Sequence, residues 1–176
     1  MTDQEKIREM LKNIIPVLNV NRIKYWIDCG TLLGVIRDGD VIEWDDDGDI
    51  SYLYSPEQLT KLRICVNWIC SYYGYHLKII RKHRPRIYYS ADRINEPWID
   101  FYAWVDKGTD SKFPGKYTNL EAGFLKALWP TIKHIGQPQL YTWGDIQVYI
   151  PEYAKARLKQ MYKNWKKPNH KMPYWG

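Results

Sequence analysis

The sequence predicts an α+β (α/β) fold in which helices pack on a small mixed β-sheet. Helical patterns occur near both ends of the chain, whereas patterns typical of strands gather in its middle. This arrangement favours helices layered on a sheet. No internal repeat or linker-like stretch divides the chain. With 176 residues, 45% of them hydrophobic, the chain can bury one sizeable core, so we expect residues 1–176 to form a single domain.

The chain is expected to open with an amphipathic helix. Thr2 and Glu5 have the spacing of a capping box, in which each side chain binds the amide of the other residue. Apolar residues then recur at helical spacing, namely Ile7, Met10, Leu11, Ile14 and Leu18. Proline removes one hydrogen bond from a helix, so we expect this helix to end or kink near Pro16.

Two short strands and a brief helix follow. A strand is predicted over residues 25–28, after which Gly30 turns the chain into a helical segment at residues 32–37. A loop at residues 38–40 then leads to a second strand. This second strand is expected to carry an acidic cluster and to run to about Tyr54.

A long helix is predicted next. Ser55 suits the N-cap, Pro56 suits the first helical position, and Gln58 stands at the reciprocal capping position. The helix should stop near Gly74. Its inward face is expected to consist of Leu59, Leu62, Val66 and Ile69.

Three further strands and a closing helix complete the prediction. The strands are expected over residues 75–80, 86–90 and 98–105, where β-branched and aromatic residues are frequent. Residues 140–150 resemble a hairpin. A basic amphipathic helix is predicted over residues 153–165.

Two details of these last segments are also predicted. The final helix should be ended by Pro168, because proline cannot continue a helix. A short helix is further expected over residues 124–128, ended by Pro130.

The most informative motif is an acidic cluster just after the predicted glycine turn. Four aspartates fall within five positions, and Trp44 precedes them as an expected core anchor. In an extended segment, Asp45, Asp47 and Asp49 project to one side while Asp46 points away. Three converging carboxylates suit Mg²⁺ or Mn²⁺. The alternative is a solvated acidic turn, but apolar residues on both sides of the run favour a strand that enters a core.

Residues suited to phosphate chemistry accompany this cluster. Gly30 allows close approach of the backbone to phosphate, and the Thr31 hydroxyl could donate a hydrogen bond to it. Asp100 lies between Ile99 and Phe101, so it should face the opposite side of its strand, where it could bind metal or accept a proton. The alternative is a surface aspartate on an edge strand. Together these residues match the needs of metal-dependent transfer of a phosphorus-linked group.

Residues 25–50, which read YWIDCGTLLGVIRDGDVIEWDDDGDI, closely resemble the signature of the LicD family, which includes fukutin and fukutin-related protein. The resemblance continues through residues 86–90, 98–101, 143–151 and 153–165. It implies a nucleotidyltransferase-like fold. It also implies Mg²⁺-dependent transfer of a phospho-alcohol, such as phosphocholine or ribitol phosphate, from a CDP-activated donor to a glycan hydroxyl, with release of CMP.

The resemblance also implies roles for single residues. Asp45, Asp47 and Asp49 would hold the metal ion, and Asp100 would be the later acidic residue, acting as a further ligand or as a catalytic group with Asp47 and Asp49. Gly48 stands where the family usually has an apolar residue. That departure could loosen the metal-binding strand, so a weakened or inactive relative that acts as a binding module is an alternative.

A donor site is implied as well, and Gly30, Thr31 and Arg37 would line it. The planar guanidinium of Arg37 suits phosphate oxygens, although a salt bridge to Asp38 or Asp40 is an equal alternative. Arg86 is a further candidate because it begins the strand beside Asp100. For the basic cluster around Arg86, an exposed hairpin turn is the alternative.

Composition and sequence patterns limit the kinds of partner and the cellular compartment that we expect. The net charge of +6 favours anionic partners. The three cysteines lack metal-type pairing, the N-terminus lacks a signal pattern, and no long apolar stretch could span a bilayer. These features predict a cytoplasmic protein without a membrane span.

Two other functions are consistent with parts of the sequence. One is a sugar-nucleotide glycosyltransferase with an Asp-X-Asp metal site, against which the glycine-turn spacing and Asp100 both argue. The other is a nucleic-acid-binding module that uses the basic and aromatic residues. We do not expect nucleic acid as a partner, because the carboxylates would repel its phosphates.

Overall fold

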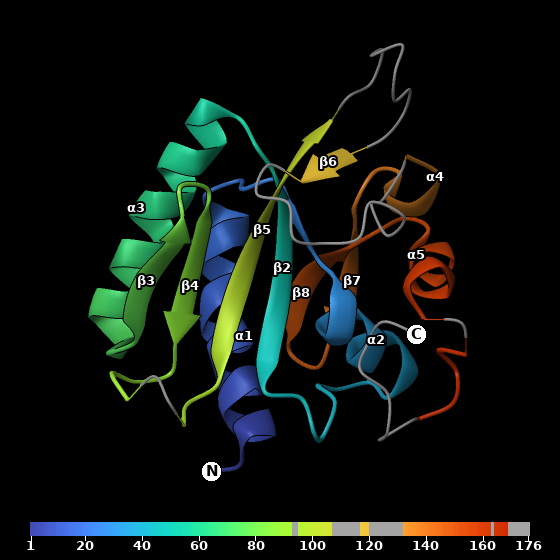
Figure 1. Cartoon of the computed structure of the whole chain (residues 1–176), viewed down its shortest axis with the longest axis horizontal. Coiled ribbons are helices and arrows are strands. Elements are labelled where there is room, and N and C mark those ends of the chain that lie inside the picture. Colours follow the sequence, from blue (N-terminus) through green and yellow to red (C-terminus); the bar gives the residue numbers. More distant parts are fainter. Residues whose placement is uncertain (93–94, 107–116, 120–131, 163, 169–176) are drawn as a thin grey trace.

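A six-stranded mixed sheet forms the centre of the protein (Figure 1). The computed structural model describes residues 1–92, 95–106, 117–119, 132–162 and 164–168. The elements, in chain order, are α1 Asp3–Val20, β1 Tyr25–Ile27, α2 Cys29–Arg37, β2 Asp47–Leu53, α3 Pro56–Tyr73, β3 His76–Arg81, β4 Arg84–Tyr88, β5 Trp98–Asp106, β6 Tyr117–Asn119, α4 Ile132–Ile135, β7 Gln139–Trp143, β8 Ile146–Ile150 and α5 Ala154–Met161.

The strand order is β1-β2-β5-β4-β3, and β6 pairs with β5. Strands β2 and β5 are parallel, whereas the other neighbours in the sheet are antiparallel. The predicted mixed sheet is therefore confirmed. The predicted helix at residues 124–128 lies outside the described residues.

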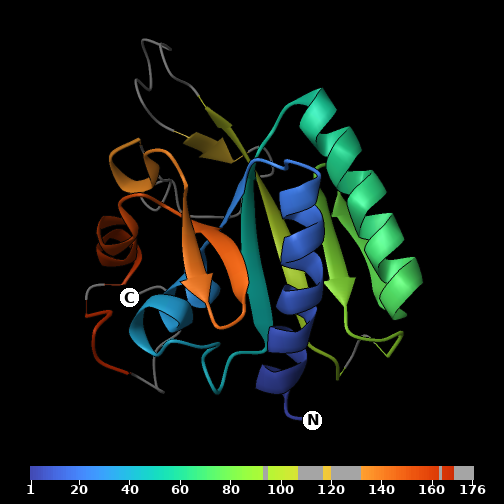
Figure 2. The same cartoon turned by 180° about the vertical axis from the view of Figure 1, so that it is seen from behind.

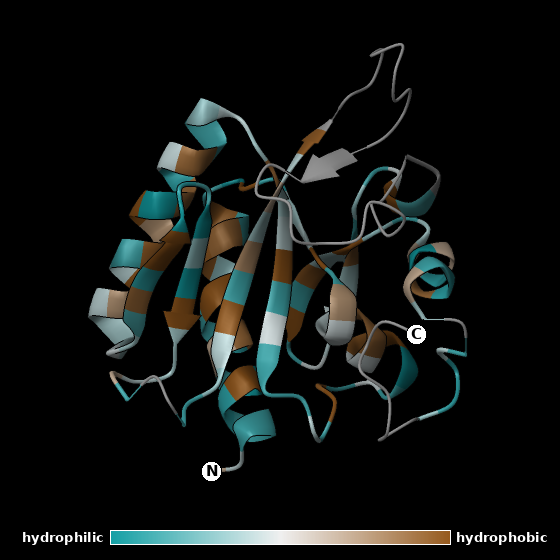
Figure 3. Ribbon diagram, viewed as in Figure 1, coloured by the Kyte–Doolittle hydropathy of each residue, from teal (hydrophilic) through white to brown (hydrophobic). Residues whose placement is uncertain are grey.

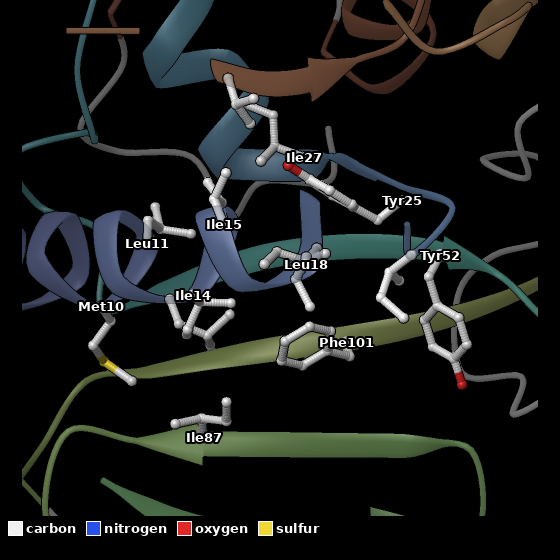
Figure 4. Close-up of a cluster of buried hydrophobic side chains, with 14 of the residues drawn as sticks. Met10, Leu11, Ile14, Ile15, Leu18, Tyr25, Ile27, Tyr52, Ile87 and Phe101 are labelled. Atoms are coloured by element: carbon white, nitrogen blue, oxygen red, sulfur yellow. The ribbon is translucent and has the colours of Figure 1, made fainter. Parts of the chain in front are cut away.

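Helices α1 and α3 cover one face of the sheet (Figure 2). The apolar residues predicted for α1 are all buried, and so are Phe101 and Ile87 on the strands beneath them (Figure 4). Because side chains alternate along a strand, the same strands present polar residues on the opposite face. In the described part of the chain, no helix lies over that face of β4 and β5 (Figure 1).

Helix α1 begins as predicted but ends later. The Thr2 hydroxyl accepts the Glu5 amide at 3.2 Å, and the Glu5 carboxylate accepts the Thr2 amide at 2.8 Å. The helix does not end near Pro16 but continues to Val20. Pro16 lies on the exposed side of the helix, where water can bind the carbonyl that loses its amide partner.

Helix α3 follows the prediction with one difference. Ser55 accepts the Gln58 amide at 3.1 Å, and Gly74 ends the helix with a φ of 76°. This left-handed conformation favours glycine. The side chain of Gln58 does not complete a capping box but accepts the backbone amide of Lys24 at 2.9 Å, so it joins α3 to the start of β1.

The closing elements lie beside α1 and β1 (Figure 2). The predicted hairpin is confirmed as β7 and β8. Helix α5 ends at Met161, seven residues before Pro168, so the expected end at this proline is wrong. The chain leaves the helix at Tyr162, whose backbone is extended and whose ring packs against the core.

Candidate active site

The acidic cluster lies where the chain enters β2. One carboxylate oxygen each from Asp45, Asp46 and Asp47 lies within 4.8 Å of the other two. Strand β2 begins only at Asp47, and the Asp45 amide closes a turn by donating to the Ile42 carbonyl at 3.1 Å. The expectation that Asp46 points away is therefore wrong, because strand alternation does not extend back to this residue. These clustered oxygens could hold a metal ion.

Trp44 also differs from the prediction. Its side chain is 37% exposed rather than buried as a core anchor. The turn at residues 43–44 explains this, because a residue in a surface turn is not carried into the core by strand alternation.

Asp49 is held against the start of α2. Its carboxylate accepts the Gly30 amide at 3.1 Å, and its own amide donates to the Thr31 hydroxyl at 2.8 Å. Both Asp49 and Thr31 are buried. Gly30 and Thr31 therefore fasten β2 to α2 and place the Asp49 carboxylate.

Glycine at position 30 leaves room for the Asp45 carboxylate. A Cβ atom there would lie 2.4 Å from Asp45 Oδ2, so a larger residue would displace that carboxylate. Asp45 and Asp49 consequently approach the same end of α2. The preceding residue, Cys29, has a φ of 49°, a conformation that costs a non-glycine residue about 1–3 kcal/mol.

Position 48 lies close to the side chain of a residue on β5. A Cβ atom at this position would lie 2.5 Å from Cδ1 of Ile99, the residue paired with Gly48 on the parallel strand β5. The side chain of Ile99 thus occupies the space that an apolar residue at position 48 would need. A larger residue at position 48 would therefore have to displace the end of the Ile99 side chain.

The cluster is electrostatically unfavourable without a cation. Burial, followed by the charges of Asp45 and Asp100, raises the pKa of Asp47 from its ordinary value of 3.8 to about 7. Burial and neighbouring carboxylates also raise the pKa of Asp49 well above its usual range. A hard divalent cation bound to these oxygens would offset the repulsion, so the donor set fits Mg²⁺ or Mn²⁺.

This raised pKa predicts a pH dependence of stability in the absence of metal. The folded protein binds the Asp47 proton more tightly than the unfolded chain does, so the contribution to stability is complete below about pH 4 and is lost as the pH rises through about 7. Urea unfolding in EDTA, compared between wild type and Asp47→Asn, isolates this contribution. We expect the free energy of unfolding of the wild type to fall more steeply over this range, and Mg²⁺ to reduce the difference. Parallel curves for the two proteins would contradict the assignment.

Asp100 lies directly beside Asp49 on the adjacent strand, since the two are paired in the parallel register of β2 and β5. It is 1% exposed. Arg86 donates to both of its oxygens, at 2.8 and 2.6 Å, and Arg84 donates to Oδ2 at 2.7 Å. The two guanidiniums lie over the rings of Trp98 and Tyr102. Two cations thus share one buried carboxylate on the open face of the sheet.

The structure places Arg37 apart from the other candidates. Arg37 is the last residue of α2, whereas Gly30 and Thr31 lie in its first turn. Its guanidinium donates to both oxygens of Asp38, at 2.7 and 2.6 Å. The salt-bridge alternative therefore describes Arg37 in this structure.

A buried ion pair, which was not predicted from the sequence, joins α5 to the start of α2. Arg157 of α5 donates to both oxygens of Asp28, at 2.9 and 3.0 Å. Asp28 also accepts the Cys29 amide that opens α2 and the Ser51 hydroxyl of β2. One feature of the sequence does indicate that Arg157 is buried. It lies at helical spacing with the buried residues Ala154, Leu158 and Met161, so it is a charged residue on the apolar face of the helix.

Comparisons with known proteins identify the family. The model of the LicD/FKTN/FKRP nucleotidyltransferase domain matches residues 22–128. The chain belongs to the LicD family. The LicD resemblance drawn from residues 25–50 is thereby confirmed, and helix α5, which supplies Arg157, lies beyond the matched segment.

Several relatives of this LicD-family chain can be compared with it. Uncharacterized proteins of Rickettsia prowazekii and Rickettsia typhi are 24% and 29% identical over 90% of the chain, and the matches cover 54% and 46% of those proteins. The chain thus spans about half their length. Human ribitol 5-phosphate transferase FKRP is 38% identical over 58 residues, which are 32% of this chain and 12% of FKRP.

A solved structure supports the fold. The antibiotic-resistance factor ANT(2'')-Ia aligns with a TM-score of 0.52 and 15% identity, over 97% of this chain and 78% of that protein. The nucleotidyltransferase-like fold implied by the resemblance is therefore confirmed. Among the helices that the structure describes, none combines the length and apolar character needed to cross a membrane.

Proposed function

We propose that this LicD-family protein is a metal-dependent transferase that moves a phospho-alcohol from a CDP-activated donor to a glycan hydroxyl. The observation that carries the proposal is the convergence of Asp45, Asp46 and Asp47 beside the buried Asp49. The partial similarity to a ribitol 5-phosphate transferase supports the class of group transferred. Asp45, Asp47 and Asp49 would hold Mg²⁺ or Mn²⁺, and Asp46 is an added candidate ligand.

When bound, the metal would polarise phosphate oxygens of the donor. The acceptor hydroxyl oxygen forms a bond to the phosphorus distal to cytidine, the bond from that phosphorus to CMP breaks, and the hydroxyl proton passes to a carboxylate. In-line attack requires donor and acceptor to be held in a fixed orientation. The open face of the sheet, which carries these carboxylates, is the surface available for that purpose.

Arg84 and Arg86 are proposed to bind the donor phosphates. The pair carries one more positive charge than Asp100 can neutralise, and guanidinium groups suit phosphate oxygens. In this proposal, the arginines move from Asp100 to the donor when it binds. That movement would leave Asp100 available as a metal ligand or as the proton acceptor.

Gly30 and Thr31 are proposed to hold a metal-binding carboxylate in place. Their hydrogen bonds to Asp49 keep a metal-binding carboxylate at the start of α2. Arg86 is the better-placed cation, because its partner Asp100 lies beside Asp49, whereas Arg37 binds Asp38 at the opposite end of α2 from Gly30 and Thr31.

Donor binding tests the proposal directly. Thermal unfolding in Mg²⁺ should show greater stabilisation by CDP-ribitol, CDP-choline or CMP than by UDP-glucose or GDP-mannose. At one hundred times the dissociation constant, the gain is about 2.7 kcal/mol, or roughly 5–10 °C for a chain of this size. The same ligands in EDTA should give a smaller shift, because a metal ion held by the carboxylates would attract the donor phosphates.

The product of the reaction provides the second measurement. A phospho-alcohol attached to the glycan, together with free CMP, is expected. Stronger stabilisation by a UDP-sugar, with sugar transferred to the acceptor, would assign the site to a glycosyltransferase instead. Ligand binding without any turnover would indicate an inactive relative.

A further inference from the structure

The open face of the sheet carries a cation at its outer edge. Strand β3 forms this edge, and its Lys78 pairs directly with Arg86 of β4, which in turn pairs with Asp100 of β5. Residues that pair directly across strands project from the same face, so Lys78 lies on the face that carries Arg86 and Asp100. Asp49 of β2 pairs with Asp100. A single row of charged residues therefore crosses four strands from Lys78 to Asp49.

The opposite face of these strands is apolar. Leu77 pairs with Ile87, and both belong to the hydrophobic core or pack against it. Hydrophilic and hydrophobic bands alternate along β2 and β5 (Figure 3), which is the pattern of strands with one face in a core. The side chain of Lys78 is exposed, so a ligand on the open face can reach it.

Positive charge exceeds negative charge on the part of this face that β3, β4 and β5 form. Arg84 and Arg86 both bind Asp100, and no salt bridge joins Lys78 to a described residue. Three cations and one carboxylate give these four residues a net charge of +2. Neither β3 nor β4 supplies a carboxylate, because residues 58–91 contain no aspartate or glutamate. Arg81 has its own interaction partner, so the excess charge is assigned without it.

The pairing of Lys78 with Arg86 is unfavourable by itself. Like charges directly opposite each other on neighbouring strands destabilise a sheet, and the carboxylate beside Arg86 is shared with Arg84. An anion bound beside the two side chains would offset this repulsion. A lysine on an edge strand also hinders pairing with another chain, but that role does not require an arginine opposite it.

We propose that Lys78 binds an anionic group, a carboxylate or a phosphate, of the acceptor glycan, and that Arg86 lies between this group and the donor phosphates. The inference rests on the proposed function, because it concerns the acceptor of the same reaction. Strands β2 and β3 are three strand spacings apart, or about 14 Å. A group beside Lys78 is therefore distant from the reacting phosphorus at the carboxylate cluster, and it belongs to a sugar beyond the one that carries the attacking hydroxyl.

The distribution of charge favours an acidic glycan over a nucleic acid. A nucleic acid carries a phosphate at every nucleotide, so a strand that followed this row would bring phosphates from Lys78 onto Asp49 and the carboxylate cluster. A glycan has uncharged sugars between its anionic groups. Such a chain can place one anion at the basic edge and a neutral sugar at the carboxylates.

Equilibrium binding in EDTA, without donor, tests the role of Lys78 independently of turnover. Titration calorimetry should detect tighter binding of oligogalacturonate or of phosphorylated maltooligosaccharides than of neutral maltooligosaccharides, and the tighter of the first two identifies the anion as carboxylate or phosphate. Lys78→Gln should weaken this binding by roughly fivefold, which is the contribution of about one exposed ion pair, and Lys78→Glu should weaken it more. Lys159→Gln removes an exposed cation from α5 and is the matched control. The melting temperature of Lys78→Gln should be no lower than that of wild type, because a like charge is removed.

Kinetics with an acidic acceptor give the second readout. Lys78→Gln should raise the KM for the acceptor and leave the KM for the CDP-linked donor unchanged. Three results would overturn the inference: equal binding of acidic and neutral oligosaccharides, equal binding by Lys78→Gln and Lys159→Gln, and a change in the KM for the donor alone, which would place the anion on the donor. Tighter binding of a single-stranded oligonucleotide than of either acidic oligosaccharide, weakened by Lys78→Gln, would assign the edge to nucleic acid instead.

Failure of this inference can be distinguished from failure of the proposed function. Transfer from a CDP-linked donor, combined with acceptor binding that does not depend on Lys78, would overturn the acceptor site alone. Binding of acidic oligosaccharides that depends on Lys78, without any transfer, would support the anion site and contradict the transferase.

Discussion

Asp47→Asn should abolish metal-stimulated transfer while leaving the fold intact. Asp47 belongs to the carboxylate cluster, and an amide cannot supply the charge that a divalent cation requires. Loss of metal polarisation removes several kcal/mol of transition-state stabilisation, so turnover should fall by on the order of a thousandfold or more. Initial rates measured over a range of Mg²⁺ concentrations, with release of CMP as the readout, would show this.

The same substitution should not lower the stability of the metal-free protein. Because Asp47 is destabilised by burial and by Asp45 and Asp100, removing its charge should leave the metal-free protein at least as stable as wild type. Asp145→Asn is a suitable control, since Asp145 is 73% exposed in the β7–β8 turn and pairs with Lys12. Wild-type activity in Asp47→Asn would show that the cluster is not the metal site. Loss of activity accompanied by unfolding would show that Asp47 is instead structural.

Arg157→Met should produce the largest loss of stability among single substitutions at the site. Methionine retains much of the volume, but Asp28, which is fully buried, would lose both guanidinium hydrogen bonds. Removing one partner of a buried ion pair costs about 3–5 kcal/mol. For a chain of this size, the melting temperature should fall by roughly 6–20 °C. Calorimetry and urea unfolding would measure the change.

Two companion variants separate the ion pair from general effects on α5. Lys159→Met changes an exposed cation on the same helix and should alter stability by less than about 0.5 kcal/mol. The double variant Asp28→Asn with Arg157→Met carries neither charge of this pair, so it should be more stable than Arg157→Met alone. If the loss of stability in the double variant equalled the sum of the losses caused by Asp28→Asn and by Arg157→Met separately, the two residues would not be coupled.

Features that depend on neighbouring residues could be predicted from the sequence. The capping box at Thr2, the Ser55 cap and the stop at Gly74 depend on neighbouring residues, and each was confirmed by the structure. The inward faces of α1 and α3 followed from 3.6-residue periodicity, because that periodicity records which side of a helix is buried. The family likewise followed from the motif over residues 25–50, whose match to the LicD domain is confirmed.

Which distant side chains meet depends on the packing of the whole chain. Pairing of β2 with β5 places Asp49 beside Asp100, and pairing of β4 with β5 brings Arg86 to the same carboxylate. Asp28 and Arg157 are 129 positions apart, so no local pattern connects them. The turn that exposes Trp44 and brings Asp46 into the cluster also depends on where β2 can begin against its neighbours. Local propensity specifies a segment's own conformation, whereas strand register and buried charge pairing depend on the packing of the whole chain.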